Sequence, residues 1–585
     1  MFKLFKNFSK IDYLFIILSV GLIALAVWFD LKIPGLTKDI TNLVISSDDT
    51  VKIWSVGFKM IGCAFASAIL SAIVGFFAAR SSSSLGKSAR LKMFNKVQSF
   101  SMEEIHKFST ASLITRTTND VSQIQNTFAI SLQLIVKAPI TAVWAIVEIL
   151  GKSWQWSIAT AGAILALLIM IIIMVVFAIP RFKVVQKQTD DLNRVMRENL
   201  LGTRVVRAYN AENYERERFD IVNTNLTNTH LFIQKIMALL SPFMQFMMNV
   251  LSLSIYWIGI ILIDKANLAN KADLFSDMIV FSQYSMRVVM SFIMLTVVFV
   301  MLPRASVSAG RINEVLDTRN SINDGNGVGK TKKKGEIEFK NVSFKYPDAE
   351  EYILKNISFK AKKGGTIAFV GSTGCGKSTL INLIPRFYDV TSGEIIVDGY
   401  NIKDYKLNEL RDKMGYVSQK AVIFSGSIKS NIEFNDKLTQ DELDMAVKIS
   451  NAEEFISEKE GKFEAEVSQG GTNLSGGQKQ RLSIARAVAK KPEFYIFDDS
   501  FSALDLKTDY NVRNALKEQC KNATKFVVAQ RIGTIKDADL ILVLDNGEVV
   551  GIGKHEKLLK ECEVYREIAL SQLSKKELNW CLEII

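Results

Sequence analysis

The sequence predicts a multi-domain protein: an all-α transmembrane domain of six helices with long helical extensions, followed by an α/β domain. Three observations predict this class. Long apolar stretches occupy the first half, short strand and helix patterns begin near residue 336, and a glycine-rich loop at 371–378 lies between a strand pattern and a helix pattern. The 585 residues exceed what one hydrophobic core serves, so at least two domains are expected.

Six stretches are apolar over enough residues to cross a bilayer, which takes about 20 helical residues. Runs such as ILALLIMIIIMVVFAI are apolar on every side, unlike the helices of soluble proteins. Basic residues precede the first stretch as in a signal peptide, but no small-x-small cleavage site follows, so we expect a retained span after a short interfacial helix. The predicted spans are residues 13–29, 53–79, 129–150, 157–179, 236–263 and 276–302.

Basic residues predict the orientation of these spans. The segments after the second and fourth spans are rich in arginine and lysine, whereas the other connections are short and less basic. The positive-inside tendency therefore places both segments, the N-terminus and the C-terminal domain in the cytoplasm of a multi-pass cell-membrane protein. This distribution accounts for much of the formal charge of +12 without nucleic acid as a partner. The five cysteines show no CxxC spacing, which indicates reduced cytoplasmic thiols.

The domain boundaries follow from composition. Both basic segments have helical apolar spacing and few breakers, so we expect helical arms that project beyond the lipid. A polar, lysine-rich stretch, RNSINDGNGVGKTKKKG, is typical of a linker. We predict a transmembrane domain at 1–315, a linker at 316–335, the α/β domain at 336–575 and a tail at 576–585.

The stretch TIAFVGSTGCGKSTLINLI predicts a phosphate-binding loop between a strand and a helix. Its glycines let the backbone curl so that N–H groups face phosphate oxygens, Lys377 reaches the β- and γ-phosphates, and Ser378 supplies a magnesium ligand. A second strand, EFYIFDDS, ends at Asp498, which would hold magnesium. The predicted loop residues are Gly371, Ser372, Thr373, Gly374, Cys375, Gly376, Lys377, Ser378 and Thr379.

Between these two motifs lies NLSGGQKQRLSIARA, in which Leu474, Ser475, Gly476, Gly477 and Gln478 would expose backbone donors at a helix start. This stretch resembles the signature motif of ATP-binding cassette (ABC) proteins. With six spans, cytoplasmic arms and a linker before it, the whole chain resembles an ABC exporter half-transporter. The resemblance implies ATP and Mg²⁺ as cofactors, a membrane translocase driven by ATP hydrolysis, and a dimer in which each signature completes the ATP site of the partner.

The resemblance extends to further residues. It implies that Tyr346 stacks on adenine, that Gln419 senses magnesium and the membrane domain, and that Asp505 couples the two sites. Magnesium would be held by Ser378, Gln419 and Asp498. The segments HKFSTASLITRTTNDV and RVVRAYNAENYERERF resemble the regions that couple the membrane domain to the cassette.

Three positions depart from the family pattern. Asp499 stands in place of the catalytic glutamate, Gln530 in place of the switch histidine, and Gln469 in place of a glutamate before the signature. An aspartate withdraws its oxygens by about one C–C bond, and a displacement near 1 Å costs on the order of 100-fold in rate. We therefore expect a site that binds ATP and hydrolyses it slowly, as in the degenerate-site subunit of heterodimeric bacterial multidrug-type exporters.

The partner expected from this pairing is a second, non-identical half-transporter with a glutamate and a histidine at those two positions. Two alternatives remain. One is a homodimeric exporter in which Asp499 is sufficient for ATP hydrolysis, and the other is a regulatory or channel-type membrane protein that is gated by ATP. The substrate would be a hydrophobic or amphipathic small molecule, lipid or peptide. Polar residues inside the spans either line its path or join helices, and these are Gln133, Lys137, Gln245, Asn249, Gln283 and Arg287.

Overall fold

A computed structural model describes residues 8–46, 50–150, 152–329, 331, 333–434 and 437–573. The chain divides into two compact units. Unit 1 contains residues 1–98 and 110–318, and unit 2 contains residues 99–109 and 319–585. The predicted N-terminal interfacial helix lies largely, and the predicted tail at 576–585 entirely, outside the described residues.

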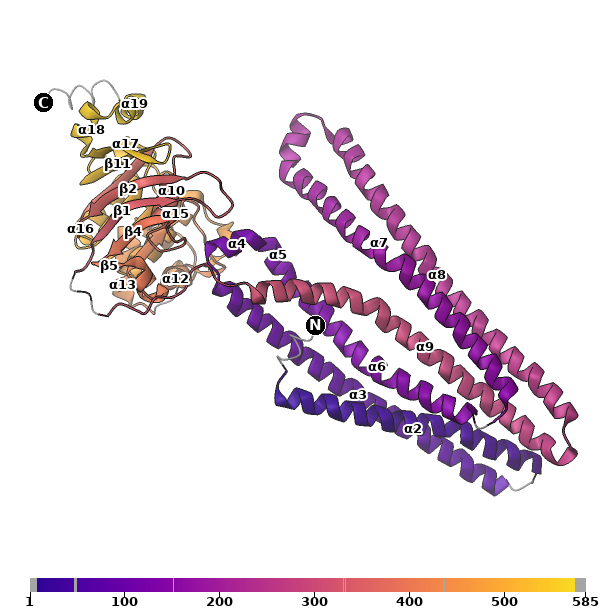
Figure 1. The fold of residues 1–585 in the computed structure, drawn as a ribbon. Coiled ribbons are helices and arrows are strands. Elements are labelled where there is room, and N and C mark those ends of the chain that lie inside the picture. Colours follow the sequence, from indigo (N-terminus) through magenta and orange to yellow (C-terminus); the bar gives the residue numbers. More distant parts are fainter. Residues whose placement is uncertain are drawn as a thin grey trace. The chain divides into compact units, whose positions relative to one another are not determined.

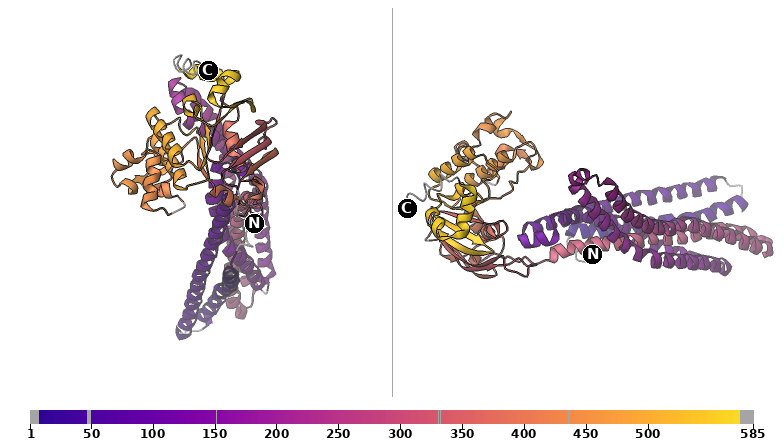
Figure 2. Two further views of the ribbon diagram at one scale, coloured as in Figure 1. Left: turned by 90° about the vertical axis from the view of Figure 1, so that its left-hand side faces the viewer. Right: turned by 90° about the horizontal axis from the view of Figure 1, so that it is seen from above.

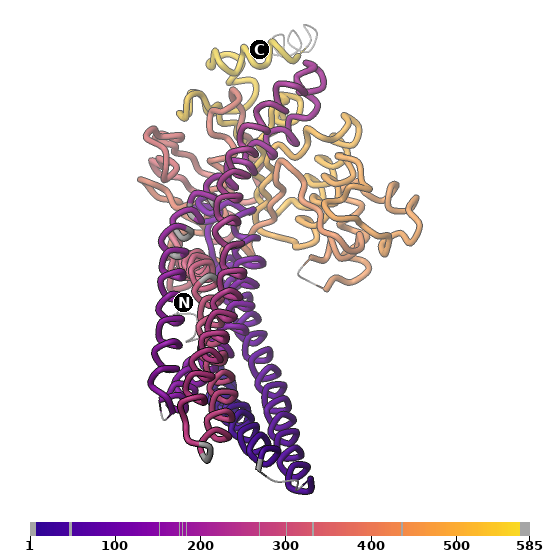
Figure 3. The backbone as a smooth tube through the Cα atoms, turned by 90° about the vertical axis from the view of Figure 1, so that its right-hand side faces the viewer, coloured from indigo at the N-terminus to yellow at the C-terminus, as the bar shows by residue number. Residues whose placement is uncertain are grey.

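Unit 1 consists of long helices, and Figures 1 and 3 show them as extended rods, several of which run side by side. Within the described residues, six helices are long and apolar enough to cross a membrane, as the hydropathy predicts. Those that continue into the two basic segments extend far beyond the apolar stretches, because these segments also have helical spacing. The helices are α2 (Lys10–Ser46), α3 (Thr50–Gln98), α5 (Thr110–Thr115), α6 (Val121–Leu150), α7 (Trp154–Ala208), α8 (Glu212–Lys265) and α9 (Leu268–Asp317), with a π-helical turn at Arg116–Asp120.

The helices of unit 1 pack mainly as pairs: α2 with α3, α6 with α9, and α7 with α8. One apolar cluster joins α2, α3, α6, α7, α8 and α9, and Trp156 and Phe281 are its largest fully buried side chains. Met244 belongs to the same cluster, and the partly buried Met247 and Met248 pack against it.

Several of the polar residues predicted within the spans have hydrogen-bond partners among the described residues. Arg287 of α9 donates to Asp30 Oδ2 of α2 at 2.5 Å, so this ion pair joins two helices. Gln245 donates to Asn249 Oδ1 one turn further along α8, at 3.3 Å. Near one end of α9, Asp277 pairs with Lys38 at 2.9 Å and also with Lys152. These contacts favour the helix-joining interpretation over a substrate path for Arg287.

Unit 2 contains an α/β core with two main sheets. The larger sheet has the strand order β12-β11-β3-β10-β9-β6 and is parallel except for β12. The smaller sheet is antiparallel, with the order β2-β1-β4-β5. The strands are β1 (Ile337–Phe344), β2 (Leu354–Ala361), β3 (Thr366–Gly371), β4 (Ser392–Val397), β5 (Tyr400–Asn401), β6 (Met414–Val417), β9 (Phe494–Asp498), β10 (Thr524–Val528), β11 (Leu540–Asp545) and β12 (Glu548–Gly553), and a two-stranded ribbon is formed by β7 (Gly426–Ser427) and β8 (Glu466–Val467).

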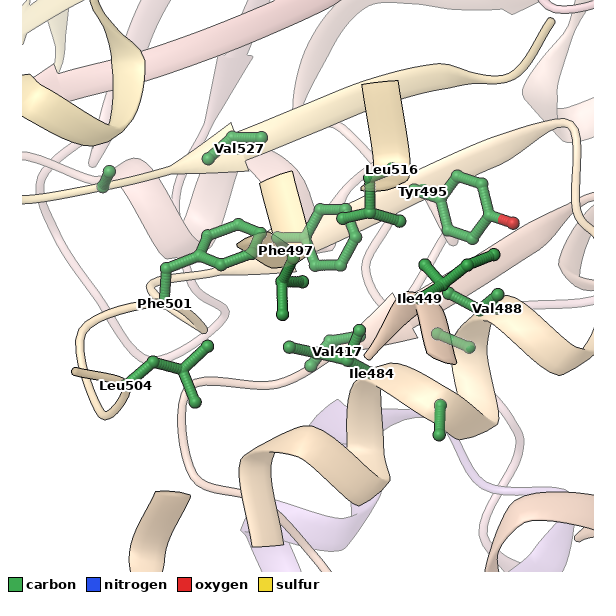
Figure 4. Packing of buried hydrophobic residues seen from close by; sticks show 14 of the residues in the cluster. Val417, Ile449, Ile484, Val488, Tyr495, Phe497, Phe501, Leu504, Leu516 and Val527 are labelled. Atoms are coloured by element: carbon green, nitrogen blue, oxygen red, sulfur yellow. The ribbon is translucent and has the colours of Figure 1, made fainter. Parts of the chain in front are cut away.

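Helices cover the sheets, and Figure 2 shows a helical part, coloured orange, beside the strands. Strands β9 and β10 are buried along their whole length, as expected for central parallel strands, which explains their continuous apolar sequences. Figure 4 shows part of the core between sheet and helices, where Phe497 and Phe501 pack among aliphatic side chains. The helices of the unit are α4 (Met102–Phe108), α10 (Lys377–Asn382), α11 (Leu407–Asp412), α12 (Ile428–Glu433), α13 (Gln440–Ile449), α14 (Glu453–Ser457), α15 (Gly476–Ala489), α16 (Leu506–Gln519), α17 (Ile532–Ile535), α18 (His555–Glu561) and α19 (Glu563–Gln572).

One helix of unit 2 comes from the middle of the membrane-domain sequence. Helix α4 and its flanking residues, 99–109, pack as part of this unit although α3 and α5 on either side belong to unit 1. Glu104 is buried and accepts hydrogen bonds from the backbone N–H of Ser101 at 2.7 Å and of Ser321 at 2.8 Å. The Tyr388 hydroxyl lies 3.2 Å from Nδ1 of His106. Helix α4 is therefore attached both to the start of the linker and to the α/β core.

Candidate nucleotide-binding site

The predicted site residues gather at one edge of the larger sheet. Strands β3, β10 and β9 are adjacent and parallel, so their carboxyl ends lie at the same edge. The glycine-rich loop follows β3, Asp498 ends β9 and Asp499 follows it, and Gln530 lies two residues after β10. Three segments far apart in the sequence thus meet at the edge where open α/β sheets bind ligands.

The loop after β3 has the backbone that phosphate binding needs. Gly371 has φ +155°, and a Cβ placed there would lie 2.0 Å from the carbonyl oxygen of Leu544, so only glycine fits. The Lys377 ammonium donates to the carbonyl oxygens of Gly371 at 2.9 Å and of Ser372 at 2.7 Å. The lysine therefore folds back over its own loop, where an incoming phosphate would replace these carbonyls as its partner. The other predicted loop residues, Thr373, Gly374, Cys375 and Gly376, lie between β3 and α10.

Ser378 and Asp498 form the predicted magnesium pair. The Ser378 hydroxyl donates to Asp498 Oδ1 at 2.8 Å, which brings two oxygen ligands together. Asp498 is buried, and burial together with the neighbouring Asp499 charge raises its pKa above the ordinary range. A hard divalent cation suits this pair, because it prefers oxygen ligands and would offset the cost of a buried carboxylate. The donor set present therefore fits Mg²⁺.

Asp499 is bound by both of the amide side chains at the site. The Gln530 amide donates to Asp499 Oδ2 at 2.8 Å, and the Gln419 amide donates to the same oxygen at 3.5 Å. The residue has φ +46°, a left-handed conformation that aspartate tolerates better than most side chains. Burial raises the pKa of Asp499 despite these hydrogen bonds, which act in the opposite direction. Two of the three positions that depart from the family pattern thus contact each other directly.

Tyr346 lies beside the phosphate loop. Its hydroxyl is 3.1 Å from Oγ1 of Thr379, and its ring meets that of Tyr388 edge to face at 5.3 Å between centroids. Burial raises the pKa of Tyr388 to about 12. The sequence did not single out Tyr388, because no motif marks a tyrosine that acts through its neighbours.

The signature residues begin helix α15. Ser475 is the N-cap: its hydroxyl accepts from Gln478 N–H at 3.3 Å, and Gln478 Oε1 accepts from Ser475 N–H at 3.0 Å. This reciprocal capping box fixes the start of the helix. Leu474 is buried as its anchor, whereas Ser475 and Gly476 are exposed. Among the described residues no hydrogen bond joins this segment to the phosphate loop of the same chain.

Asp505 lies at the start of α16, where its carboxylate accepts from Thr508 N–H at 3.0 Å. Hydrogen bonds from Thr508 lower its pKa. Gln572, near the C-terminal end of α19, donates to the carbonyl oxygen of Gln530 at 2.8 Å and so holds the backbone next to the site. That contact also escaped the sequence analysis, since glutamine in a short C-terminal helix carries no recognisable signal.

Comparison with known proteins gives the family. Residues 14–293 match the model of the ABC transporter transmembrane region, and residues 354–502 match the model of the ABC transporter cassette. An uncharacterized ABC transporter ATP-binding protein of Mycobacterium tuberculosis is 36% identical over 553 residues, 93% of each chain. An ATP-dependent lipid A-core flippase of Pseudomonas aeruginosa is 33% identical over 492 residues, 83% of this chain and 80% of the relative.

The fold is similar to that of solved exporters. The structure of a bacterial Atm1-family ABC exporter with ATP bound superposes with a TM-score of 0.83 over 96% of this chain and 99% of the other, at 23% identity. The chain therefore belongs to the ABC transporter family and has the fold of its exporters, with a multi-pass transmembrane region and an ATP-binding cassette in one polypeptide.

Proposed function

We propose that this chain is one half of an ATP-driven exporter, that its own nucleotide site binds MgATP but hydrolyses it slowly, and that a non-identical half-transporter supplies the site that turns over. The contact between Gln530 and Asp499 carries this proposal. The exporter would move hydrophobic or amphipathic molecules from the cytoplasm or the inner leaflet by alternating access, with both the N-terminus and the cassette in the cytoplasm.

Slow hydrolysis follows from the chemistry at Asp499. Catalysis would require a carboxylate that reaches the attacking water, and the side chain here is one methylene shorter than glutamate. The Gln530 amide also occupies Oδ2 at 2.8 Å, so the carboxylate must break this bond before it can orient water through that oxygen. A misplacement of about 1 Å costs on the order of 100-fold. Gln530 itself has no group that exchanges a proton near neutral pH, unlike histidine.

Binding would survive these changes because the binding groups are separate from them. Lys377 and the curled loop would bind the phosphates, Ser378 and Asp498 would bind the metal, and the Tyr346 ring would stack on the base. None of these interactions uses the side chain of Gln530. The expected outcome is a nucleotide with a long residence in this site, which would favour the closed state of the cassettes.

A partner chain would use the signature of this subunit. Ser475 and Gly476 are exposed and held in place by the capping box, as expected for donors that complete a site on a second chain. A homodimer would contain two sites with Asp499 and Gln530 and would turn over slowly. The lipid A-core flippases among the relatives support an amphipathic substrate, since their names describe the movement of a lipid.

Restoring the family residues tests the slow site. We expect the double variant Asp499→Glu with Gln530→His to raise ATP hydrolysis by purified, full-length protein on the order of 10- to 100-fold. Asp499→Asn should change the already low rate little, and Lys377→Ala should weaken nucleotide binding in either background. The measurement is steady-state phosphate release, with ATP binding followed in parallel. Brisk hydrolysis by the unmodified chain alone, lost in Asp499→Asn, would contradict the proposal and favour the homodimer.

The partner is tested separately by purifying the tagged chain from its native host. A second half-transporter with glutamate after its magnesium-binding aspartate and histidine at its switch position should accompany it. Recovery of this chain only with copies of itself would disprove the heterodimer, whatever the rate of hydrolysis.

A further inference from the structure

A cavity whose residues are far in sequence from the nucleotide site lies between α6 and α9 of unit 1. Its volume is about 400 Å³, and it is lined by Gln123, Asn126, Ala129, Ile130, Met301 and Arg304. Helices α6 and α9 pack along much of their length, and Figure 1 shows them next to each other. The walls combine two amides and a guanidinium with apolar side chains.

The lining of this cavity changes from polar to apolar residues at the ends of the predicted spans. Gln123 and Asn126 precede the span predicted at 129–150, and Arg304 follows the span predicted at 276–302. Ala129, Ile130 and Met301 lie inside those spans. The cavity therefore has a polar part at the level where a bilayer has its headgroups and an apolar part toward its hydrocarbon.

Arg304 is the one cation in this cavity, and its charge is not neutralised by any carboxylate among the described residues. Its guanidinium lies over the Phe182 ring of α7, 4.8 Å from the centroid, which holds the planar group in place and leaves its N–H donors available. Arg287 and Arg116 of the same unit differ, because Asp30 and Glu314 pair with them.

We propose that this cavity binds the anionic headgroup of an amphiphile, with Arg304 as the anion-binding residue and the amides of Gln123 and Asn126 as additional donors. A guanidinium presents paired donors that match phosphate or carboxylate oxygens. The volume suits a headgroup with the first part of a chain, and the rest of the chain would lie in lipid. This inference rests on the proposed exporter function only where it takes the bound amphiphile to be a transported substrate. Binding itself requires no ATP.

Equilibrium binding tests the site without the nucleotide cycle. The full-length transporter is placed in nanodiscs of phosphatidylcholine and dialysed to equilibrium against radiolabelled dodecyl phosphate. The amount of probe taken up by empty nanodiscs is subtracted from the amount bound. We expect saturable binding that Arg304→Gln weakens about tenfold and that Arg304→Lys retains in large part. Dodecyl maltoside, which shares the chain but is neutral, and inorganic phosphate, which lacks the chain, should compete poorly.

The matched control is Arg181→Gln. Arg181 also lies just beyond a span and over an aromatic ring, Phe232, at 4.9 Å, but it is not part of the cavity. Its variant should bind the probe as the unmodified protein does. Equal losses in both variants, absence of saturable binding, or equal competition by dodecyl maltoside or by inorganic phosphate would each overturn the proposal. Because ATP is absent throughout, none of these outcomes depends on whether the nucleotide site is slow or the assembly heterodimeric.

Discussion

At the residue scale, Asp498 and Asp499 are two adjacent carboxylates that are both buried. Burial raises the pKa of each, and the charge of Asp499 raises that of Asp498 further. A carboxylate whose pKa is raised in the folded protein favours folding at low pH, and this contribution is lost as the pH rises through the folded pKa. From pH 3.8, the ordinary value, toward neutrality these residues therefore reduce the free energy of unfolding.

Asp499→Asn should remove part of this penalty. Asparagine keeps an oxygen that accepts from Gln530, and it tolerates the left-handed backbone at φ +46°. We expect the thermal midpoint of the metal-free, full-length variant to fall less steeply with rising pH than that of the unmodified chain. Circular dichroism in detergent over a pH series measures this slope. A slope as steep as that of the unmodified chain would show that ionisation of Asp499 does not lower the free energy of unfolding.

At the element scale, α15 shows how local sequence rules place a functional segment. The Ser475–Gln478 capping box was readable as a helix start, and the structure begins α15 there. Helix α13 has the same device at Thr439 and Glu442 but carries no part of the signature. The two helices therefore allow capping to be separated from a role in the partner site.

Ser475→Ala and Thr439→Ala should each reduce stability by about 1 kcal/mol, because each removes an N-cap acceptor. In the proposed assembly the Ser475 hydroxyl would also donate to the transferring phosphate of the partner site, so only Ser475→Ala should also lower ATP hydrolysis by the assembled transporter, on the order of tenfold or more. Denaturation midpoints and steady-state hydrolysis of both variants give the comparison. Equal effects on hydrolysis would mean that Ser475 acts only as a cap.

The elements were predictable to different degrees for physical reasons. Hydropathy and helical spacing alone predict the six long helices. The motif predicts the loop after β3, because its glycines are needed where a side chain would clash. The contact of Gln530 with Asp499 was not predictable, because it depends on β9 and β10 being neighbours in the sheet. The resemblance predicts that the segment from His106 to Val121 docks on the cassette, and its first residues, 106–109, do pack in unit 2, whereas residues 110–121 belong to unit 1. The part played by residues 99–105 was not predicted, because a stretch as short as MEEIHKF does not show from its own sequence which unit it packs in.

At the scale of the whole molecule, α4 is the short segment of the membrane-domain sequence that packs with the cassette. Glu104 anchors it: burial raises the pKa of this carboxyl, but hydrogen bonds from Ser101 and Ser321 outweigh burial and leave the pKa below its ordinary value. Its contribution to stability is therefore present above pH 4.5 and lost as the pH falls through the lowered pKa. Near neutral pH the anchor is ionised and intact.

The contact of α4 with the nucleotide site runs through Tyr388, which meets both Tyr346 and His106. If Tyr346 moves when a base stacks on it, the contact through Tyr388 would therefore move α4, and with it the adjoining ends of α3 and α5.

Tyr388→Phe keeps the ring contact and removes only the hydroxyl bond to His106. We expect this variant to show normal ATP-induced protection from amide hydrogen exchange in the cassette but a reduced ATP-induced change in the helices of unit 1. The control is Tyr405→Phe, which removes a hydroxyl bond to the carbonyl oxygen of Val397 inside the cassette and should leave both responses unchanged. If Tyr388→Phe left the response of the helices intact, nucleotide binding would reach them by another route, such as the segment between α7 and α8.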